Sequence, residues 1–165
     1  MQGFISYAHY DYKAFTRAAK HISHVARAFK IDMWSDTRIK AGNYWSPKIQ
    51  AEIAKSDLFV LLVTNDFLGS DYIFDRELPA IIDQHKNRGA LLVPIILRPC
   101  GWKLFFGDYI QAVPGDGAGG IRPALDWPKP ENGLAAAADA FGQAVADWFG
   151  LVPATPFDAL KGKTP

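Results

Sequence analysis

The feature that most constrains the fold is an apolar run of six residues, 58–63, which Asp57 and Thr64 close with polar side chains. A run of this length is too short for an independent helix and is typical of a strand buried on both faces, as in the middle of a parallel sheet. A polar turn and a small-residue corner follow the run before helical spacing begins at residue 72. The apolar positions of that helix, expected to face the core, are Phe74, Leu78, Ile81 and Ile82.

Glu77 lies off this apolar stripe, within the first turns after the carboxyl end of the predicted strand. Ligands bind at that end of the strands in open α/β sheets. Pro79 cannot donate a hydrogen bond to the carbonyl of Asp75, so the helix is expected to begin near Arg76 or to bend there. The interpretation of the whole chain therefore depends on the role of Glu77.

Three other apolar stretches, 3–8, 31–34 and 90–97, predict further strands. The second is short and alternates, which suits a place near the sheet edge. Pro94 inside the last one indicates that a neighbouring strand is missing on one side over part of its length. Residues 98–129 mix aromatic residues with Gly and Pro and predict irregular packing with at most one short strand.

Helical patterns alternate with these strands. Asp11 is a candidate N-cap of the first helix, and Pro47 suits the first position of the second. The helix after the central strand is expected to end near Gly89, and a last helix at Gly150. Such alternation gives right-handed crossovers and a parallel sheet. The predicted fold is α/β, a flavodoxin-like three-layer sandwich with a four- to five-stranded parallel sheet in the order 2-1-3-4-5 and helices on both faces.

The topological switch point of this strand order lies between the first and third strands. The pattern therefore predicts a ligand site with Tyr7, Ala8 and His9 on one side and residues 65–77 on the other.

Length and composition indicate that the chain of 165 residues holds one domain, at 1–150, with 151–165 as a tail or a linker to an absent domain. The net charge of +1 gives no footprint for direct binding of nucleic acid. Cys100 stands alone, no leader precedes the first strand and no run could span a bilayer, so we expect a cytoplasmic protein without membrane contact. The four histidines have no partners at ligand spacing, so no metal is expected.

Four segments occur in the order and at the spacing of the boxes of a known family: 4–7 (FISY), 34–42 (WSDTRIKAG), 67–73 (FLGSDYI) with Glu77 after it, and 93–102 (VPIILRPCGW). On these segments the chain resembles TIR (Toll/interleukin-1 receptor) domains. Some members are scaffolds that assemble with other TIR domains. Others, many of them bacterial, cleave the nicotinamide–ribose bond of NAD+ or convert NAD+ into a cyclic or variant ADP-ribose.

The resemblance implies that Glu77 is the catalytic residue of an NAD+ nucleosidase, with NAD+ as substrate and no cofactor. Several bacterial members have a tryptophan where this chain has Tyr72 or Ile73, so stacking on the nicotinamide would fall to Tyr72 or Tyr44, or be weaker. A ribose contact is the role implied for Ser70. The implied substrate-binding residues are Tyr7, Ala8, His9, Asp36, Arg38, Tyr44, Trp45, Ser70 and Tyr72.

The family resemblance also implies self-association through the loop at 35–42, a sensor domain beyond Pro165 or on a partner protein, and a role in bacterial immunity against phage. Alternatives stay open at this point. Glu77 could be a solvated helix residue that pairs with Arg76 or Lys86, and Ser70 could be only a turn residue. The whole domain could be a non-catalytic TIR–TIR scaffold, and a flavodoxin or receiver domain would fit the fold alone.

Overall fold

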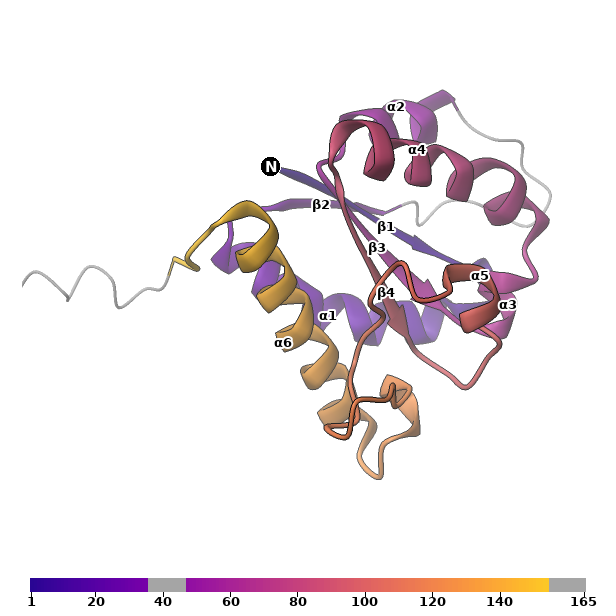
Figure 1. Cartoon of the computed structure of the whole chain (residues 1–165), viewed down its shortest axis with the longest axis vertical. Coiled ribbons are helices and arrows are strands. Elements are labelled where there is room, and N and C mark those ends of the chain that lie inside the picture. The colour runs from indigo at the N-terminus through magenta and orange to yellow at the C-terminus, as the bar shows by residue number, and fades with distance from the viewer. Residues whose placement is uncertain (36–46, 155–165) are drawn as a thin grey trace, which may run out of the picture.

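A parallel sheet in the order β2-β1-β3-β4 forms the middle of the protein (Figure 1). The computed structural model describes residues 1–35 and 47–154, and in these ranges the sheet has four strands. The order agrees with the predicted one and confirms the flavodoxin-like α/β fold. The strands are β1 (Gln2–Tyr7), β2 (Asp32–Ser35), β3 (Leu58–Val63) and β4 (Leu91–Ile96).

The apolar run at 58–63 is the central strand β3, between β1 and β4. All six of its side chains are buried, because helices cover both faces of the sheet at this place. Its neighbour β1 is paired on both sides, with Ser6 opposite Leu61 of β3. The strand β2 lies at the edge and is only partly buried, as its alternating sequence predicts.

Two groups of helices cover the two faces of the sheet (Figure 1). Helices α1 (Tyr12–Ala28) and α6 (Pro130–Phe149) pack on the face that presents Ile5, Val60 and Leu62. The opposite face presents Phe4, Phe59 and Leu61. Its helices are α2 (Pro47–Lys55), α3 (Asn65–Leu68), α4 (Leu78–Arg88) and α5 (Lys103–Phe106).

Among the described residues, the outer side of β4 has one backbone partner in place of a fifth strand. Val113 donates its N–H to the carbonyl of Pro94 and accepts from the N–H of Ile96, at 2.9 and 2.8 Å. The nitrogen of Pro94 therefore faces the side where the neighbouring chain is reduced to a single bridge. This confirms the prediction, based on Pro94 in the sequence, that a neighbouring strand is missing on one side of β4 over part of its length. Two one-turn 3-10 helices, η1 (His9–Asp11) and η3 (Ala124–Asp126), complete the connections.

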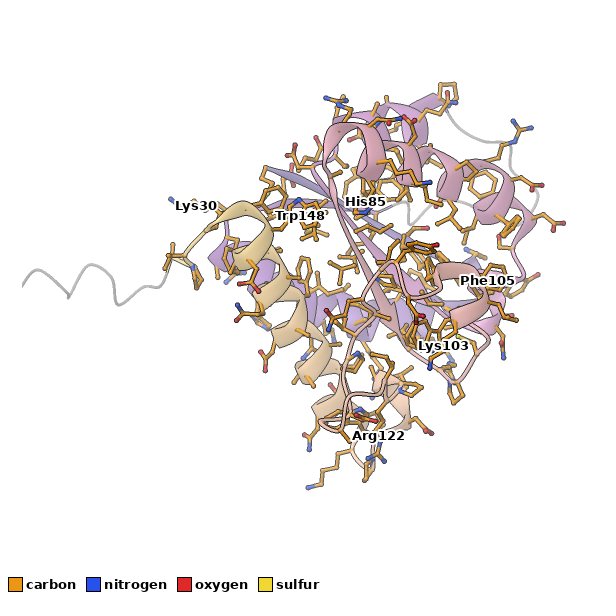
Figure 2. All side chains as sticks on the ribbon, in the orientation of Figure 1. Lys30, His85, Lys103, Phe105, Arg122 and Trp148 are labelled. Carbon is orange, nitrogen blue, oxygen red and sulfur yellow. The ribbon has the colours of Figure 1, made fainter. Side chains whose placement is uncertain are left out.

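The ends of helices α4 and α6 follow the sequence signals. Gly89 and Gly150 both adopt the left-handed conformation, with φ of 70° and 62°, and end α4 and α6 as glycine caps do. Trp148 of α6 then reaches the end of α4, where its Nε1 donates to the carbonyl of Gly89 at 2.9 Å, close to the ring of His85 (Figure 2).

Candidate functional site

The site lies at the carboxyl ends of β1 and β3. After β1 the chain turns through η1 into α1 on one face of the sheet, whereas after β3 it turns through α3 towards α4 on the opposite face. Two neighbouring parallel strands whose connections leave to opposite faces form a topological switch point, where ligands bind in folds of this kind. The place is the one that the strand order predicts.

Glu77 points to the sheet at this end. The Oγ of Ser6, in β1, donates a hydrogen bond of 2.6 Å to Oε2 of Glu77, and both residues are buried, with 2% and 5% of their surface exposed. The hypothesis that Glu77 is a solvated helix residue is therefore wrong.

A π-helical turn, Ile73–Glu77, gives Glu77 this direction. The N–H of Leu78 donates to the carbonyl of Ile73, five residues back, so the turn holds one residue more than an α-turn. Pro79 follows directly and could not have supplied an α-helical bond to Asp75. Turns of this type are frequent at functional sites.

The wide turn also corrects the predicted apolar stripe. Phe74, expected in the core, is 50% exposed, while Ile73 is buried. An extra residue in the turn shifts every position before it by about 100° around the helix axis relative to those after it. A pattern read at constant helical spacing therefore places Leu78 and Ile81 correctly and Phe74 on the wrong side.

A second buried carboxylate, Asp11, lies at the same end of the sheet. It follows β1 and accepts a hydrogen bond from Oγ1 of Thr64, the residue after β3. Burial raises the pKa of Asp11 above its ordinary value of 3.8, and the nearby charge of Asp66 adds to the rise. The hydrogen bond from Thr64 and the charge of Arg98 act in the opposite direction, but the pKa stays raised. Asp11 occupies the N-cap position of α1, but its side chain does not bond to that helix. Asp11 is thus the N-cap residue of α1, as predicted, but its carboxylate accepts from Thr64 and makes no bond to the helix.

The predicted residues at the end of β1 and just after it point in different directions. The ring of Tyr7 stacks on Phe15 of α1, with ring centroids 4.0 Å apart, on the face opposite to Glu77. Ala8 is buried on the same face as Glu77, and His9 is exposed in η1. Alternation along a strand explains the separation of Tyr7 from Ala8. Only Ala8 of these three lies on the face of Glu77.

The predicted residues after β3 lie at the start of the π-turn. The Oγ of Ser70 accepts a hydrogen bond of 3.3 Å from the N–H of Ile73, so Ser70 does cap this turn. Tyr72 is half-buried and packs against the core on the Glu77 face. The other predicted binding residues, Asp36, Arg38, Tyr44 and Trp45, lie outside the described residues. All of these binding roles stay predictions.

Ser6 is the site residue that the sequence reasoning missed. It is the polar position in the apolar stretch from Phe4 to Ala8, and period-two alternation places it on the same face as those two residues. A serine on the buried face of an inner strand needs a partner. That signal was available, but not the identity of the partner, which lies 71 residues away.

Other kinds of site find little support in the part of the chain that the structure describes. No group of three or more His, Cys, Asp or Glu residues there could hold a metal ion. Burial raises the pKa of the Cys100 thiol, which is the opposite of what activates a cysteine. None of the helices within residues 1–35 and 47–154 combines the length and the apolar character that spanning a membrane requires.

Comparison with known proteins places the chain in a family. Residues 4–115, which contain the sheet, the π-turn and both buried carboxylates, match the TIR domain family. The chain belongs to the TIR domain family. This TIR domain is also 33% identical over 162 residues to "Uncharacterized protein y4lF" of Sinorhizobium fredii (strain NBRC 101917 / NGR234). The aligned region covers 98% of this chain and 49% of that relative, so the chain spans about half of the relative's length.

Proposed function

We propose that this TIR domain is an NAD+ glycohydrolase or ADP-ribosyl cyclase, and that Glu77 is its catalytic carboxylate. The observation that supports the proposal is the placement of Glu77: a side chain from the helix after β3 is turned inward at the switch point and bonded to Ser6 of β1 at 2.6 Å. Membership of the TIR family supports NAD+ as the substrate, since this family includes enzymes that cleave NAD+.

The chemistry needs one carboxylate and no acid. Nicotinamide in NAD+ is a cationic pyridinium, so when the bond between C1′ of the ribose and the ring nitrogen breaks, the electron pair goes to nitrogen and a neutral molecule leaves. Positive charge then develops on the ribose. The fixed negative charge of Glu77 stabilises that charge electrostatically, as preorganised groups do in dry sites. Attack of water on C1′ with loss of a proton gives ADP-ribose; attack by another atom of the substrate gives a cyclic product.

Access of substrate to Glu77 requires a rearrangement, because only 5% of this residue is exposed. Self-association of copies is the trigger that the family resemblance implies, so we expect dilute protein to turn over slowly and concentrated protein to turn over fast. A substrate-binding role for loop residues such as Arg38, and a role in defence against phage, stay predictions within this proposal.

The experiment that tests the proposal measures NAD+ consumption by concentrated protein, free and after forced assembly on a multivalent support, with the products separated by chromatography. The Glu77→Gln variant is run beside the native protein. Loss of NAD+ that the substitution abolishes supports the enzyme and names its product. Absence of turnover in the assembled native protein contradicts it.

A non-catalytic scaffold is the second candidate, and one surface feature favours it. Phe74 and Phe105 are 50% and 42% exposed and meet edge to face, with centroids 5.8 Å apart; Phe105 lies beside Lys103 on α5 (Figure 2). Exposed aromatic pairs are typical of protein-binding surfaces. If Phe74→Ser with Phe105→Ser abolished association with other TIR domains while Glu77→Gln changed nothing measurable, the scaffold would be the better account.

A further inference from the structure

We propose that Ser6 is a positioning residue, which holds the carboxylate of Glu77 in the orientation that the reaction needs. This inference rests on the proposed function and concerns the same site. Neither the family match nor the sequence pattern assigns Ser6 a role. The bond from its Oγ to Oε2 of Glu77, 2.6 Å long and buried, is the observation behind it.

The donor lies on a rigid element. Ser6 belongs to β1, which is paired with β2 on one side and β3 on the other, and its backbone is in register with Leu61 of the central strand. A side chain on a doubly paired inner strand is held more firmly than one on a loop. The position of its Oγ is therefore set by the sheet.

The acceptor lies on a less regular element. Glu77 ends a π-helical turn, and such turns have a less favourable backbone than an α-helix. A glutamate has three side-chain torsions, and the last one is broad. The Ser6 bond fixes Oε2, and with it the plane of both oxygens, against the sheet.

Ser6 acts through Glu77 and not on the substrate. Only 2% of Ser6 is exposed. Its single hydroxyl proton is donated to Glu77. The role left to it is to set the direction of the negative charge, which determines how well that charge faces the developing cation on the ribose.

The test compares Ser6→Ala, Ser6→Thr and Ser56→Ala in steady-state NAD+ cleavage. Ser56 is the matched control: it is a buried serine, 5% exposed, just before the other end of β3, and its hydroxyl bonds to the carbonyl of Glu52. We expect Ser6→Ala to lower kcat about 10- to 100-fold, the range for a lost hydrogen bond to a charged group, with KM changed less than about threefold. Ser6→Thr keeps the hydroxyl and is expected to restore most of kcat.

Three outcomes overturn the inference while the proposed function stands. In the first, Ser6→Ala lowers kcat no more than Ser56→Ala does, and in the second it changes KM alone. In the third outcome, Ser6→Thr is folded but its kcat is as low as that of Ser6→Ala. Thermal unfolding of each variant shows whether it is folded, and if Ser6→Ala does not fold, Ser6→Thr and Ser6→Cys, whose thiol is a weak donor, take its place. If the assembled native protein does not cleave NAD+, the proposed function fails and the inference fails with it.

Discussion

The two buried carboxylates at the switch point are arranged reciprocally. Asp11 follows β1 and accepts its bond from Thr64 after β3, while Glu77 follows the β3 connection and accepts its bond from Ser6 in β1. The partners are 53 and 71 residues apart in the chain. Each carboxylate thus ties the connection of one strand to the other strand. In one bond the carboxylate belongs to the connection after β1, and in the other it belongs to the connection after β3.

The surroundings of the two bonds differ. The hydroxyl of Thr64 also accepts the N–H of Phe67 at 3.1 Å, so the Asp11 bond is part of the start of α3. Asp11 itself is in the short helix that leads directly into α1. Glu77, in contrast, stands on an irregular turn and meets a serine within a strand. We infer that the Asp11 bond organises two helix starts, whereas the Glu77 bond orients a reacting group.

The largest expected effect separates the two carboxylates by activity. Glu77→Gln should lower NAD+ turnover about 100-fold or more, because the amide keeps an oxygen for Ser6 but has no negative charge to stabilise the ribosyl cation. Asp11→Asn should leave turnover within about fivefold of the native value. Most of the electrostatic stabilisation of the ribosyl cation is expected to come from the charge nearest to the reacting atoms, which is that of Glu77. Turnover at equal monomer concentration is the measurement. Equal losses in both variants would contradict the assignment of separate roles.

The second effect separates the two hydroxyls by stability. Thr64→Val should lower the free energy of unfolding by about 1–3 kcal/mol, since it leaves the buried Asp11 without its donor and α3 without its cap. Thr64→Ser keeps the hydroxyl and is the control, expected to lose less. Denaturant titration at constant pH gives both values. A valine variant as stable as the serine variant would mean that the Asp11 bond contributes nothing to the fold.

The smallest effect concerns pH. Because the pKa of Asp11 is raised in the folded state, the folded protein binds protons more tightly than the unfolded chain above about pH 3.8. The contribution of protonated Asp11 to stability is therefore full below that pH and is lost as the pH rises through the folded-state pKa. Asp11→Asn has no such group, so the stability of the native protein relative to this variant should fall as the pH rises from about 4. If the stability of the native protein relative to Asp11→Asn rose with pH, the pKa of Asp11 would be lowered in the folded state and the prediction would be wrong.

The sequence predicted those parts of the fold that follow from uninterrupted patterns. The apolar run at 58–63 could only be an inner strand, Pro94 marked the incomplete side of β4, and Gly89 and Gly150 marked helix ends. Together with the strand order that is usual for so short an α/β chain, these patterns predicted the place of the site. Glu77 was located correctly near that place.

What the sequence did not predict depends on contacts between distant segments. A π-turn differs from an α-turn by one residue, and no residue type in Ile73–Glu77 signals it, so Phe74 was assigned to the core. Whether Asp11 caps its own helix or accepts from Thr64 depends on which donor the fold brings closer. The partner of Ser6 could be found only after β1 and the helix after β3 were placed together.

The incomplete outer side of β4 has a consequence for how copies of the protein can meet. A free strand edge is a template on which another chain can add by backbone hydrogen bonds, and proline is one of the devices that prevent it. At this edge Pro94 has no N–H to offer, and Val113 already holds its carbonyl. At this point of β4 the addition of a strand from another copy is therefore blocked, and contacts between copies here would be made by side chains.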